Sequence, residues 1–383
     1  MKKLHALYAA MIPGMLMAAE PQTGSGETDG YFLVWQDLFD SGELNRARWN
    51  VEVNNSGGGN NELQYYIDNP ANVHVGDDGQ GNGCLILTAR REEYGNRHFT
   101  SGRVNSKNKI AFTHGKIEAS IKLPKTADGL WPAFWMMGND YDQVGWPKCG
   151  ETDILEMGHS DGIRNGNQER FFNGACHWGQ GWPNASYAKS TSKAYSLQDG
   201  EFHLFTAIWD DQKIRMYVDL DKQPKQNPYY ELVYPQDDPE NEWSAGNYFH
   251  KDNFILFNLA VGGNFPGIHD HLQITALGPE QGSEASMYIN YVKIYQKNGI
   301  GENQSFAEPG DDISGVKLQY AEKENNIEFD GDYVYTQGEP LSLFTPAGQL
   351  AREASDGRIE LSGLMPGIYI ATTKTASRKI AIR

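Results

Sequence analysis

The sequence contains few cysteines and no pattern that would indicate a cysteine-based metal site. There are three in 383 residues, Cys84, Cys149 and Cys176, so at least one has no partner within the chain. A disulfide between Cys149 and Cys176 and three buried free thiols are both compatible with the sequence. The spacing of cysteine and histidine does not indicate zinc, and no metal ligands are predicted.

Basic residues are also scarce, and long apolar runs are absent after the first 20 residues. Lysine and arginine number 33 against 50 acidic residues, which gives a net charge of −17. This charge argues against nucleic acid and anionic membrane surfaces as partners, but it does not exclude a neutral substrate. No later stretch reaches the ~20 apolar residues that a transmembrane helix needs, so no transmembrane segment is predicted.

Helical heptads are missing, whereas glycine (42 residues) and aromatic residues (12%) are plentiful. This composition is typical of a β-rich protein with many tight turns. Segments such as "FHLFTAIWD", "KIRMYVDL" and "FILFNLAVGG" predict short strands, several of which alternate apolar and polar residues. Because such alternation places one sheet face on the core and the other in water, we expect an all-β fold, a sandwich of two antiparallel sheets.

Composition divides the chain into four segments. Residues 1–19 begin with positive charge, continue as an apolar run and end in two alanines, which predicts a signal peptide. Residues 28–298 hold the main series of strands, and the polar residues 299–312 are predicted to form a linker. Residues 313–383 have strand signals of their own and predict a small second β-sandwich, near the lower size limit for an independent core.

The stretch "GETDILEMGH" crowds Glu151, Asp153 and Glu156 among hydrophobic residues. Its β-branched residues favour a strand, in which Glu151 and Asp153 share one face and Glu156 points to the other. A β-bulge around Ile154–Leu155 would turn all three carboxylates to the same face, and bulges are frequent next to active sites. The alternative is a solvated charged strand without a catalytic role.

Clustered carboxylates suit retaining glycoside hydrolysis. One carboxylate attacks the anomeric carbon, while another protonates the leaving oxygen and later activates water. Because neighbouring carboxylates cannot all ionise cheaply, one of them acquires a raised pKa and can serve as the acid. We expect the central Asp153 to hydrogen-bond Glu151 and to tune it.

Sugar substrates also need flat apolar surfaces, and tryptophans flank the acids. In "GLWPAFWMMG", Trp131 and Trp135 share one face of a predicted strand. Trp146 precedes the acids, and "CHWG" adds His177 and Trp178. All five are candidate substrate contacts. The alternative is that the tryptophans belong to the core and that His177 is an ordinary packed histidine.

These stretches resemble glycoside hydrolase family 16, in its laminarinase-like branch. The resemblance is most specific in "WPAFWMMG" followed by "GWPKCGETDILEMGH", and "NNELQYY", "HGKIEASIKLP", "FNLAVGGNFPG" and "YINYVKIYQ" follow the family's order over nearly all of residues 31–296. The family's bulged version has the same E-x-D-x-x-E spacing. The resemblance implies a concanavalin-like jelly roll with a concave cleft and retaining cleavage of β-glucans.

Carried over by position, the resemblance implies that Glu151 is the nucleophile, Asp153 its helper and Glu156 the acid/base. The residues that it places on the glycone side of the cleft are Asn55, Arg103, Trp131, Trp135, Trp146 and His177. The implied activity is an endo-β-glucanase acting on β-1,3 or mixed β-1,3-1,4 glucan. Agarase- or carrageenase-type hydrolysis is the runner-up, and a non-catalytic glucan-binding lectin is the alternative from another class, although a lectin does not need three clustered carboxylates.

Members of this family often hold a structural calcium ion, and the sequence departs from that pattern at two positions. Asn290 in "YINYVKIY" stands where an aspartate is usual, and Leu38 in "QDLFD" stands where a glutamate is usual. Both departures argue against calcium. No cofactor is predicted.

The C-terminal unit resembles the sorting domain of the type IX secretion route in Bacteroidetes, through "LFTPAGQL", "LSGLMPGIYI" and "RKIAIR". The alternative is a small carbohydrate-binding sandwich. Its lack of tryptophan disfavours sugar stacking, although Tyr333, Tyr335 and Phe344 remain. With the signal peptide, the resemblance predicts a protein that is secreted or held at the cell surface of a Gram-negative bacterium. We expect a monomer.

Overall fold

The computed structural model of the protein describes residues 31–234, 236–297, 304–306, 327–329, 332–336, 338–345, 350–364, 367–373 and 377–382. The predicted signal peptide, residues 1–19, lies outside the described residues. Within the described ranges, no helix has the length and apolar character needed to cross a membrane.

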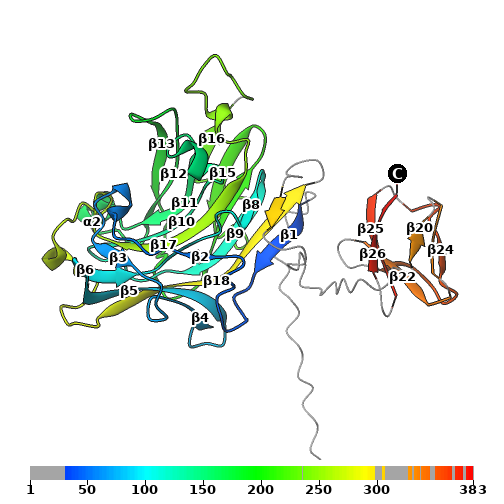
Figure 1. The fold of residues 1–383 in the computed structure, drawn as a ribbon, viewed down its shortest axis with the longest axis horizontal. Helices are drawn as coiled ribbons and strands as arrows, with labels where there is room; N and C mark the ends of the chain where they lie inside the picture. The colour runs from blue at the N-terminus through cyan, green and yellow to red at the C-terminus, as the bar shows by residue number, and fades with distance from the viewer. Residues whose placement is uncertain are drawn as a thin grey trace, which may run out of the picture.

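Two sheets, built from nineteen strands, form the main part of the chain (Figure 1). The strands in chain order are β1 (Tyr31–Asp37), β2 (Asn50–Val51), β3 (Gln64–Tyr66), β4 (Val73–Asp77), β5 (Gly83–Tyr94), β6 (Arg97–Ser101), β7 (Arg103–Asn105), β8 (Ile110–Phe112), β9 (Gly115–Lys122), β10 (Leu130–Gly138), β11 (Glu151–Met157), β12 (Phe171–Trp178), β13 (Ala185–Ser192), β14 (His203–Trp209), β15 (Lys213–Val218), β16 (Tyr230–Val233), β17 (Asn253–Val261), β18 (Glu284–Lys297) and β19 (Gln304–Phe306). The short helices between them are η1 (Gly57–Gly59), α1 (Tyr141–Val144), α2 (Ser160–Arg164), η2 (Ala245–Asn247) and η3 (His271–Gln273).

Sheet A follows the order β16-β15-β14-β9-β18-β5-β6-β3, with β1 paired to β18 and β4 to β5. Sheet B follows the order β13-β12-β11-β10-β17-β7-β2, with β8 paired to β17 and β19 to β8. The pairing is antiparallel except between β3 and β6. Buried side chains from both sheets form one large core, so the predicted antiparallel sandwich is confirmed.

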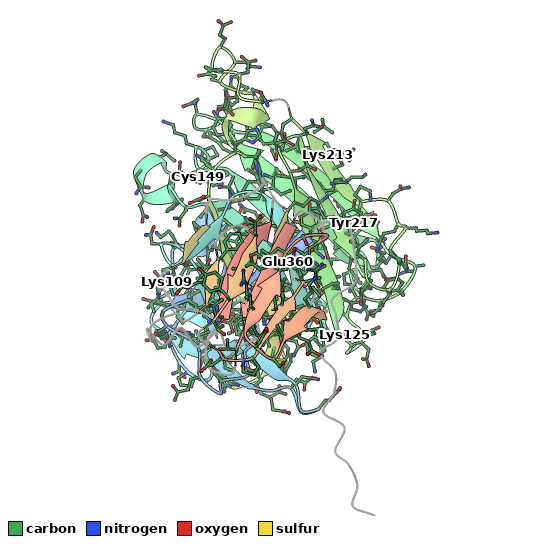
Figure 2. All side chains as sticks on the ribbon, turned by 90° about the vertical axis from the view of Figure 1, so that its right-hand side faces the viewer. Lys109, Lys125, Cys149, Lys213, Tyr217 and Glu360 are labelled. Atoms are coloured by element: carbon green, nitrogen blue, oxygen red, sulfur yellow. The ribbon has the colours of Figure 1, made fainter. Side chains whose placement is uncertain are left out.

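Alternation along the strands explains how each sheet has one face on this core. In β9, Ile117, Ala119 and Ile121 are buried in it. The opposite face of sheet A carries polar and aromatic side chains, among them Lys213 and Tyr217 of β15 (Figure 2). For sheet B, the face turned away from the core is called the outer face below, and it carries the candidate site.

The three cysteines are all buried free thiols in the part of the chain that the structure describes. Burial raises the pKa of each thiol to about 12. Of the two alternatives that the sequence leaves open, the structure therefore has free thiols and no bond between Cys149 and Cys176.

The C-terminal unit consists of two further sheets. One contains β20 (Glu328–Phe329), β21 (Tyr333–Tyr335) and β24 (Arg358–Glu360), and the other contains β22 (Leu341–Phe344), β23 (Leu350–Ala354), β25 (Gly367–Thr372) and β26 (Ser377–Ile382). Ile327, Val334, Leu343 and Ile380 belong to a separate apolar core. This arrangement confirms the predicted small β-sandwich.

The expected linker differs from the structure in one respect. Strand β19, residues 304–306, lies within the stretch 299–312 and pairs with β8 of sheet B. Sheet B therefore extends beyond the boundary that the polar composition suggested at residue 298. Polar composition misses this strand because three residues at a sheet edge need little apolar surface.

Candidate active site

The three acids lie on β11, near the middle of sheet B, and the strand contains a bulge. Asp153 pairs with Ala175 of β12, whereas Glu156 pairs with Asn173, so β11 takes three steps where its neighbour takes two. The pairing with β10 slips at the same place. Ile154 and Leu155 are both buried in the core, so the extra residue lies between Asp153 and Glu156. The predicted bulge is confirmed, and all three carboxylates reach the outer face.

Each of the two glutamates accepts a hydrogen bond from a tryptophan. Trp146 Nε1 donates to Glu151 Oε2 at 3.1 Å, and Trp131 Nε1 donates to Glu156 Oε1 at 3.2 Å. Trp131 also stacks on Phe265, with the ring centres 4.5 Å apart and the planes at 9°. These bonds orient the carboxyl groups, and Trp131 serves the outer face instead of the large core.

Asp153 lies next to a histidine. His177 Nε2 is 3.5 Å from Asp153 Oδ2 and 4.0 Å from Glu151 Oε1. Asn184 Nδ2 lies 3.4 Å from the other ring nitrogen, Nδ1. Among the described residues, the hydrogen bond that the sequence predicts between Asp153 and Glu151 is not formed, and both carboxyls approach His177 instead. Burial lowers the pKa of His177, which favours a neutral ring at pH 7.

Burial and mutual repulsion raise the pKa of all three acids. Burial raises the pKa of Glu151 to about 7, although Arg103 and the Trp146 indole oppose the shift. Burial and the charge of Glu151 raise the pKa of Glu156 to about 8, against the bond from Trp131. Asp153 is shifted well above its ordinary pKa by burial and by both neighbours. Glu151 is thus the acid next to a cation, and Glu156 holds its proton to higher pH.

Arg103 of β7 is fixed by contacts on two sides. Its Nε lies 2.9 Å from Glu52 Oε1, and its guanidinium carbon lies 4.9 Å from the centre of the Trp135 ring. The Trp135 indole donates to Asn258 Oδ1 at 2.8 Å. Sequence reasoning missed Glu52 and Asn258, because their roles depend on strands that are distant in the chain. The stretch "FNLAVGG" pointed to the right strand but not to the amide.

Two of the predicted substrate contacts lie apart from this group. Asn55 is not a neighbour of the acids in the contacts described: its Nδ2 donates to Asn96 Oδ1 at 2.7 Å. Trp178 is a correction. It follows His177 directly, so it points to the opposite side of β12, where it is buried in the core, 5.7 Å from the Phe249 ring. Its large apolar ring suited the core better than the outer face.

Comparison with known proteins assigns the chain to a family. The sequence pattern of "Glycosyl hydrolases family 16" matches residues 58–245. A glucan endo-1,3-beta-glucosidase of Cryptopygus antarcticus is 34% identical over 247 residues, which are 62% of this chain and 83% of that protein. The chain belongs to glycosyl hydrolase family 16.

Structural comparison agrees with this assignment. The GH16 protein of a Bacteroides ovatus mixed linkage glucan PUL, solved in complex with a G4G4G3G product, is 40% identical to this family 16 chain. It matches with a TM-score of 0.59 and covers 68% of this chain and 100% of that chain. This likeness supports the jelly-roll form of the sandwich.

Other relatives of this family 16 chain differ in length and in name. Two curated relatives are matched over only 34% and 38% of their own lengths. A beta-1,3-glucan-binding protein of Penaeus monodon is 28% identical over 277 residues, which are 60% of this chain and 74% of that protein. Turnover therefore has to be argued from the site, because a shared fold does not establish it.

The calcium site that is frequent in family 16 does not fit the residues here. Asn290 Nδ2 donates a hydrogen bond to the Gly83 carbonyl at 2.9 Å. An amide that turns its N–H toward this carbonyl offers a cation no negative charge, and Leu38 supplies no side-chain oxygen where a glutamate is usual. Calcium therefore has no part in the mechanism derived below. Glu151, Asp153 and His177 do present ligand atoms within 4.8 Å of one another, a spacing that could hold a metal ion, but their contacts are explained by acid–base chemistry.

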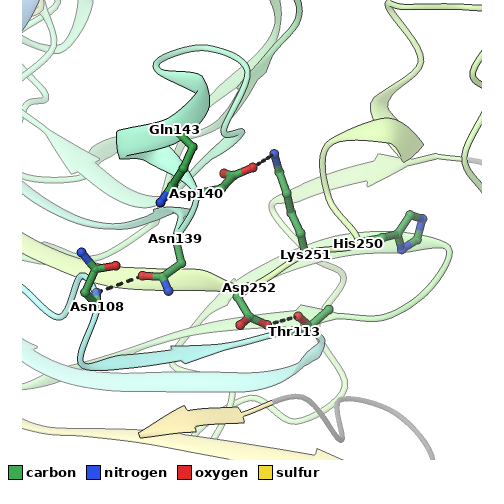
Figure 3. Close-up of a pocket in the computed structure, with 8 residues that line it drawn as sticks. All are labelled: Asn108, Thr113, Asn139, Asp140, Gln143, His250, Lys251 and Asp252. Carbon is green, nitrogen blue, oxygen red and sulfur yellow. Dashed lines mark hydrogen bonds and ion pairs between the residues drawn. The ribbon is translucent and has the colours of Figure 1, made fainter. Parts of the chain in front are cut away.

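A recess of about 540 Å³ lies beside the connection between β10 and β11, which also carries Trp146 (Figure 3). Its lining residues are Asn108, Thr113, Asn139, Asp140, Gln143, His250, Lys251 and Asp252. Lys251 Nζ lies 2.7 Å from Asp140 Oδ2 and donates to the Lys148 carbonyl at 2.9 Å, so one ammonium joins both ends of the connection between β10 and β11. This tie positions the tryptophan that binds Glu151.

Proposed function

We propose that this family 16 chain is a retaining endo-β-glucanase that hydrolyses β-1,3 or mixed-linkage β-1,3-1,4 glucans by double displacement. The observation that carries the proposal is the bulge in β11, which turns Glu151, Asp153 and Glu156 to one face. A tryptophan N–H group bonds the carboxyl of each of the two glutamates, and the two glutamates lie in different charged environments. Separate pKa values are what a nucleophile and a general acid require.

In the first step, the Glu151 carboxylate attacks the anomeric carbon. The bond from that carbon to the glycosidic oxygen breaks, and the oxygen takes the proton of Glu156. Arg103 favours the ionised form of Glu151, and the charge of Glu151 favours the protonated form of Glu156. The two groups therefore begin the reaction in the protonation states that they need.

In the second step, the roles at Glu156 reverse. After the first step Glu156 is a carboxylate. It takes a proton from a water molecule while the oxygen of that water attacks the anomeric carbon. The ester bond to Glu151 breaks, and the sugar is released with the original configuration. Asp153 lies between the two, and burial and the neighbouring carboxylates raise its pKa well above the ordinary value, which disfavours a second negative charge beside the nucleophile.

The names of the relatives and the net charge of this chain both support a neutral glucan as the substrate. One relative is named a glucan endo-1,3-beta-glucosidase, and one solved neighbour holds a mixed-linkage product. The net charge of −17 disfavours a sulfated polymer, which would call for basic residues around the acids. The net charge therefore favours glucan over carrageenan as the substrate.

The test is product analysis on laminarin, mixed-linkage β-glucan, cellulose, agarose and carrageenan side by side, with the anomer of the first product followed by NMR. We expect short β-glucan oligosaccharides in the β configuration. Inversion would contradict double displacement. Tight glucan binding without any product would favour the lectin alternative.

We further propose that the protein is exported as a monomer and that the C-terminal unit is a sorting domain. Support comes from the charged and apolar start of the chain and from the separate apolar core of that unit. A chain ending at residue 306, which keeps β19, should hydrolyse glucan at close to the full-length rate but fail to cross the outer membrane of its host. Normal export with lower activity on insoluble glucan alone would instead favour a binding module.

A further inference from the structure

The two flanks of β11 differ on the outer face of sheet B. On the β10 side lie large side chains, including Trp131, Trp135 and the Arg103 head that covers Trp135. On the β12–β13 side the register pairs Ala175 with Ala188, and Ser186 and Ser190 of β13 lie on either side of Ala188. Between His177 and Asn173 of β12, this flank is therefore a floor of small side chains, which alone does not make a site.

One amide oxygen in this floor has no hydrogen-bond partner among the residues that the structure describes. Asn173 of β12 pairs directly with Glu156 of β11, and on the other side it pairs with Ser190 of β13. Only 6% of Asn173 is exposed. Among the described residues nothing bonds to its Oδ1. A buried amide oxygen without a partner is costly, so each such group in a native fold calls for an explanation.

The position of Asn173 beside Glu156 suggests what the partner is. Glu156 gives its proton to the glycosidic oxygen, and this oxygen leaves with the sugar on the leaving-group side of the bond. That sugar must therefore lie next to Glu156. On the β10 side Glu156 already bonds Trp131, which stacks on Phe265, whereas on the β12 side its direct strand neighbour is Asn173.

We propose that Asn173 is a specificity-determining residue for the leaving sugar, whose hydroxyl donates to Asn173 Oδ1 while its ring lies over the small side chains of β12 and β13. This inference rests on the proposed function and extends it. The ligand is a neutral sugar with a hydroxyl beside the cleaved bond. A leaving group without such a hydroxyl gains nothing from Asn173.

The experiment compares two substrates that share the same glucosyl donor part. One is a β-gluco-oligosaccharide, and the other is its nitrophenyl glycoside, in which nitrophenol replaces the leaving sugar. Asn173→Leu keeps the approximate volume and removes the amide. We expect kcat/KM to fall about tenfold on the oligosaccharide, the loss of one hydrogen bond, with less than a twofold change on the nitrophenyl glycoside.

A stability measurement separates this role from a structural one. Because the amide oxygen has no partner among the described residues, Asn173→Leu should melt at a temperature no lower than the unmodified protein. Asn253→Leu is the matched control: Asn253 is 1% exposed, and its Oδ1 also has no partner, but its strand neighbour Phe254 belongs to the cluster beside Trp135, so Asn253 points to the other side of β17. This control should leave the ratio of the two rates unchanged. Asn173→Ser is the second variant, should the leucine fail to fold.

Three outcomes would overturn the inference. Equal losses on both substrates, with a shifted basic limb of the pH profile, would mean that Asn173 acts through Glu156. Unchanged rates on both would mean that the amide binds only water. An unmodified protein that hydrolyses neither substrate would contradict the proposed function itself, and the subsite with it.

Discussion

The guanidinium carbon of Arg103 lies 4.9 Å from the centre of the Trp135 ring. With the ion pair to Glu52, this contact fixes a cation close enough to lower the pKa of Glu151 against the effect of burial. Three buried carboxyls would otherwise all favour the protonated form. In the proposed mechanism, the arginine therefore favours Glu151 as the nucleophile.

Removing this cation should move the acid limb of the pH profile. Burial of Glu151 would then be opposed by the Trp146 indole alone, so its pKa should rise above about 7, and kcat/KM on soluble glucan should begin to fall at a higher pH in Arg103→Met. Arg103→Lys keeps a charge and should show a smaller shift. The limbs report the coupled acids together, so the comparison is between whole profiles. An acid limb that stays in place in Arg103→Met would rule out this role for the arginine.

Replacing either glutamate should abolish most of the turnover. Glu156→Gln should lower kcat on polysaccharide by about 10²–10⁴-fold, because the amide cannot donate the proton that the leaving oxygen takes in the proposed first step. Glu151→Gly should be inactive but should form an α-glycosyl azide when azide is added, since the small anion can attack from the vacated side. Circular dichroism checks the fold, and Glu201→Gln, an exposed acid, is the control. Full activity in Glu156→Gln would end the assignment.

A buried ion pair outside the site should give the fold a pH-dependent stability. His203 Nδ1 lies 2.8 Å from Asp219 Oδ2, and the two residues are 3% and 1% exposed. Burial alone would lower the pKa of His203, but the bonds and charges of Asp219 and Asp199 outweigh it and raise the pKa. Burial likewise opposes the bonds from His203 and Tyr195 that lower the pKa of Asp219.

The directions of these two pKa shifts determine how the stability of the fold changes with pH. The stabilisation from charged His203 is complete below its ordinary pKa of 6.5 and is lost as the pH rises through the raised value. That from Asp219 is present above 3.8 and is lost as the pH falls. His203→Gln should therefore lower the free energy of unfolding in urea by about 1–3 kcal/mol at pH 6 and by less at pH 9. A difference between variant and unmodified protein that is the same at both pH values would contradict this assignment.

The Asn290 amide should make the fold indifferent to calcium. Because Asn290 Nδ2 already binds the Gly83 carbonyl, neither EDTA nor millimolar calcium should change the melting temperature by more than about 1 °C. Asn290→Asp removes that donor and adds a charge. The variant should therefore melt at a lower temperature in EDTA, and calcium should raise its melting temperature again. Asn253→Asp serves as a control for a buried charge elsewhere. A drop in melting temperature when EDTA is added to the unmodified protein would show that the amide does not replace the ion.

The sequence predicts much of the site because the strand period links spacing to direction. Three acids at spacings of two and three can share one face of a strand only if the strand contains a bulge, and the register of β11 against β12 bears this out. The same period could have warned against Trp178, since a residue directly after His177 must point the other way. The aromatic side chain of Trp178 suggested a contact with sugar, but the residue is buried in the main core, which takes up large apolar groups.

Contacts between distant strands could not be predicted in this way. Glu52 and Arg103 are brought together by pairing between β2 and β7, and Asn258 reaches Trp135 from β17. Glu52 and Asn258 have no local signal, because each is made a neighbour of the site by the order of strands in the sheet. The strand order of a jelly roll comes here from resemblance to a family and not from the local pattern.

The bulge in β11 also sets how the length of this strand can change. Deletion of Ile154 would restore regular pairing with β10 and β12, and it would leave Glu151, Asp153 and the former Glu156 at even spacings on the outer face. Deletion of Thr152 would instead turn Glu151 toward the core. Deletion of one residue between Asp153 and Glu156 thus keeps all three acids on the outer face, whereas deletion of the residue between Glu151 and Asp153 does not. In a library of single-residue deletions across the strand, surviving hydrolytic activity should be confined to that short interval.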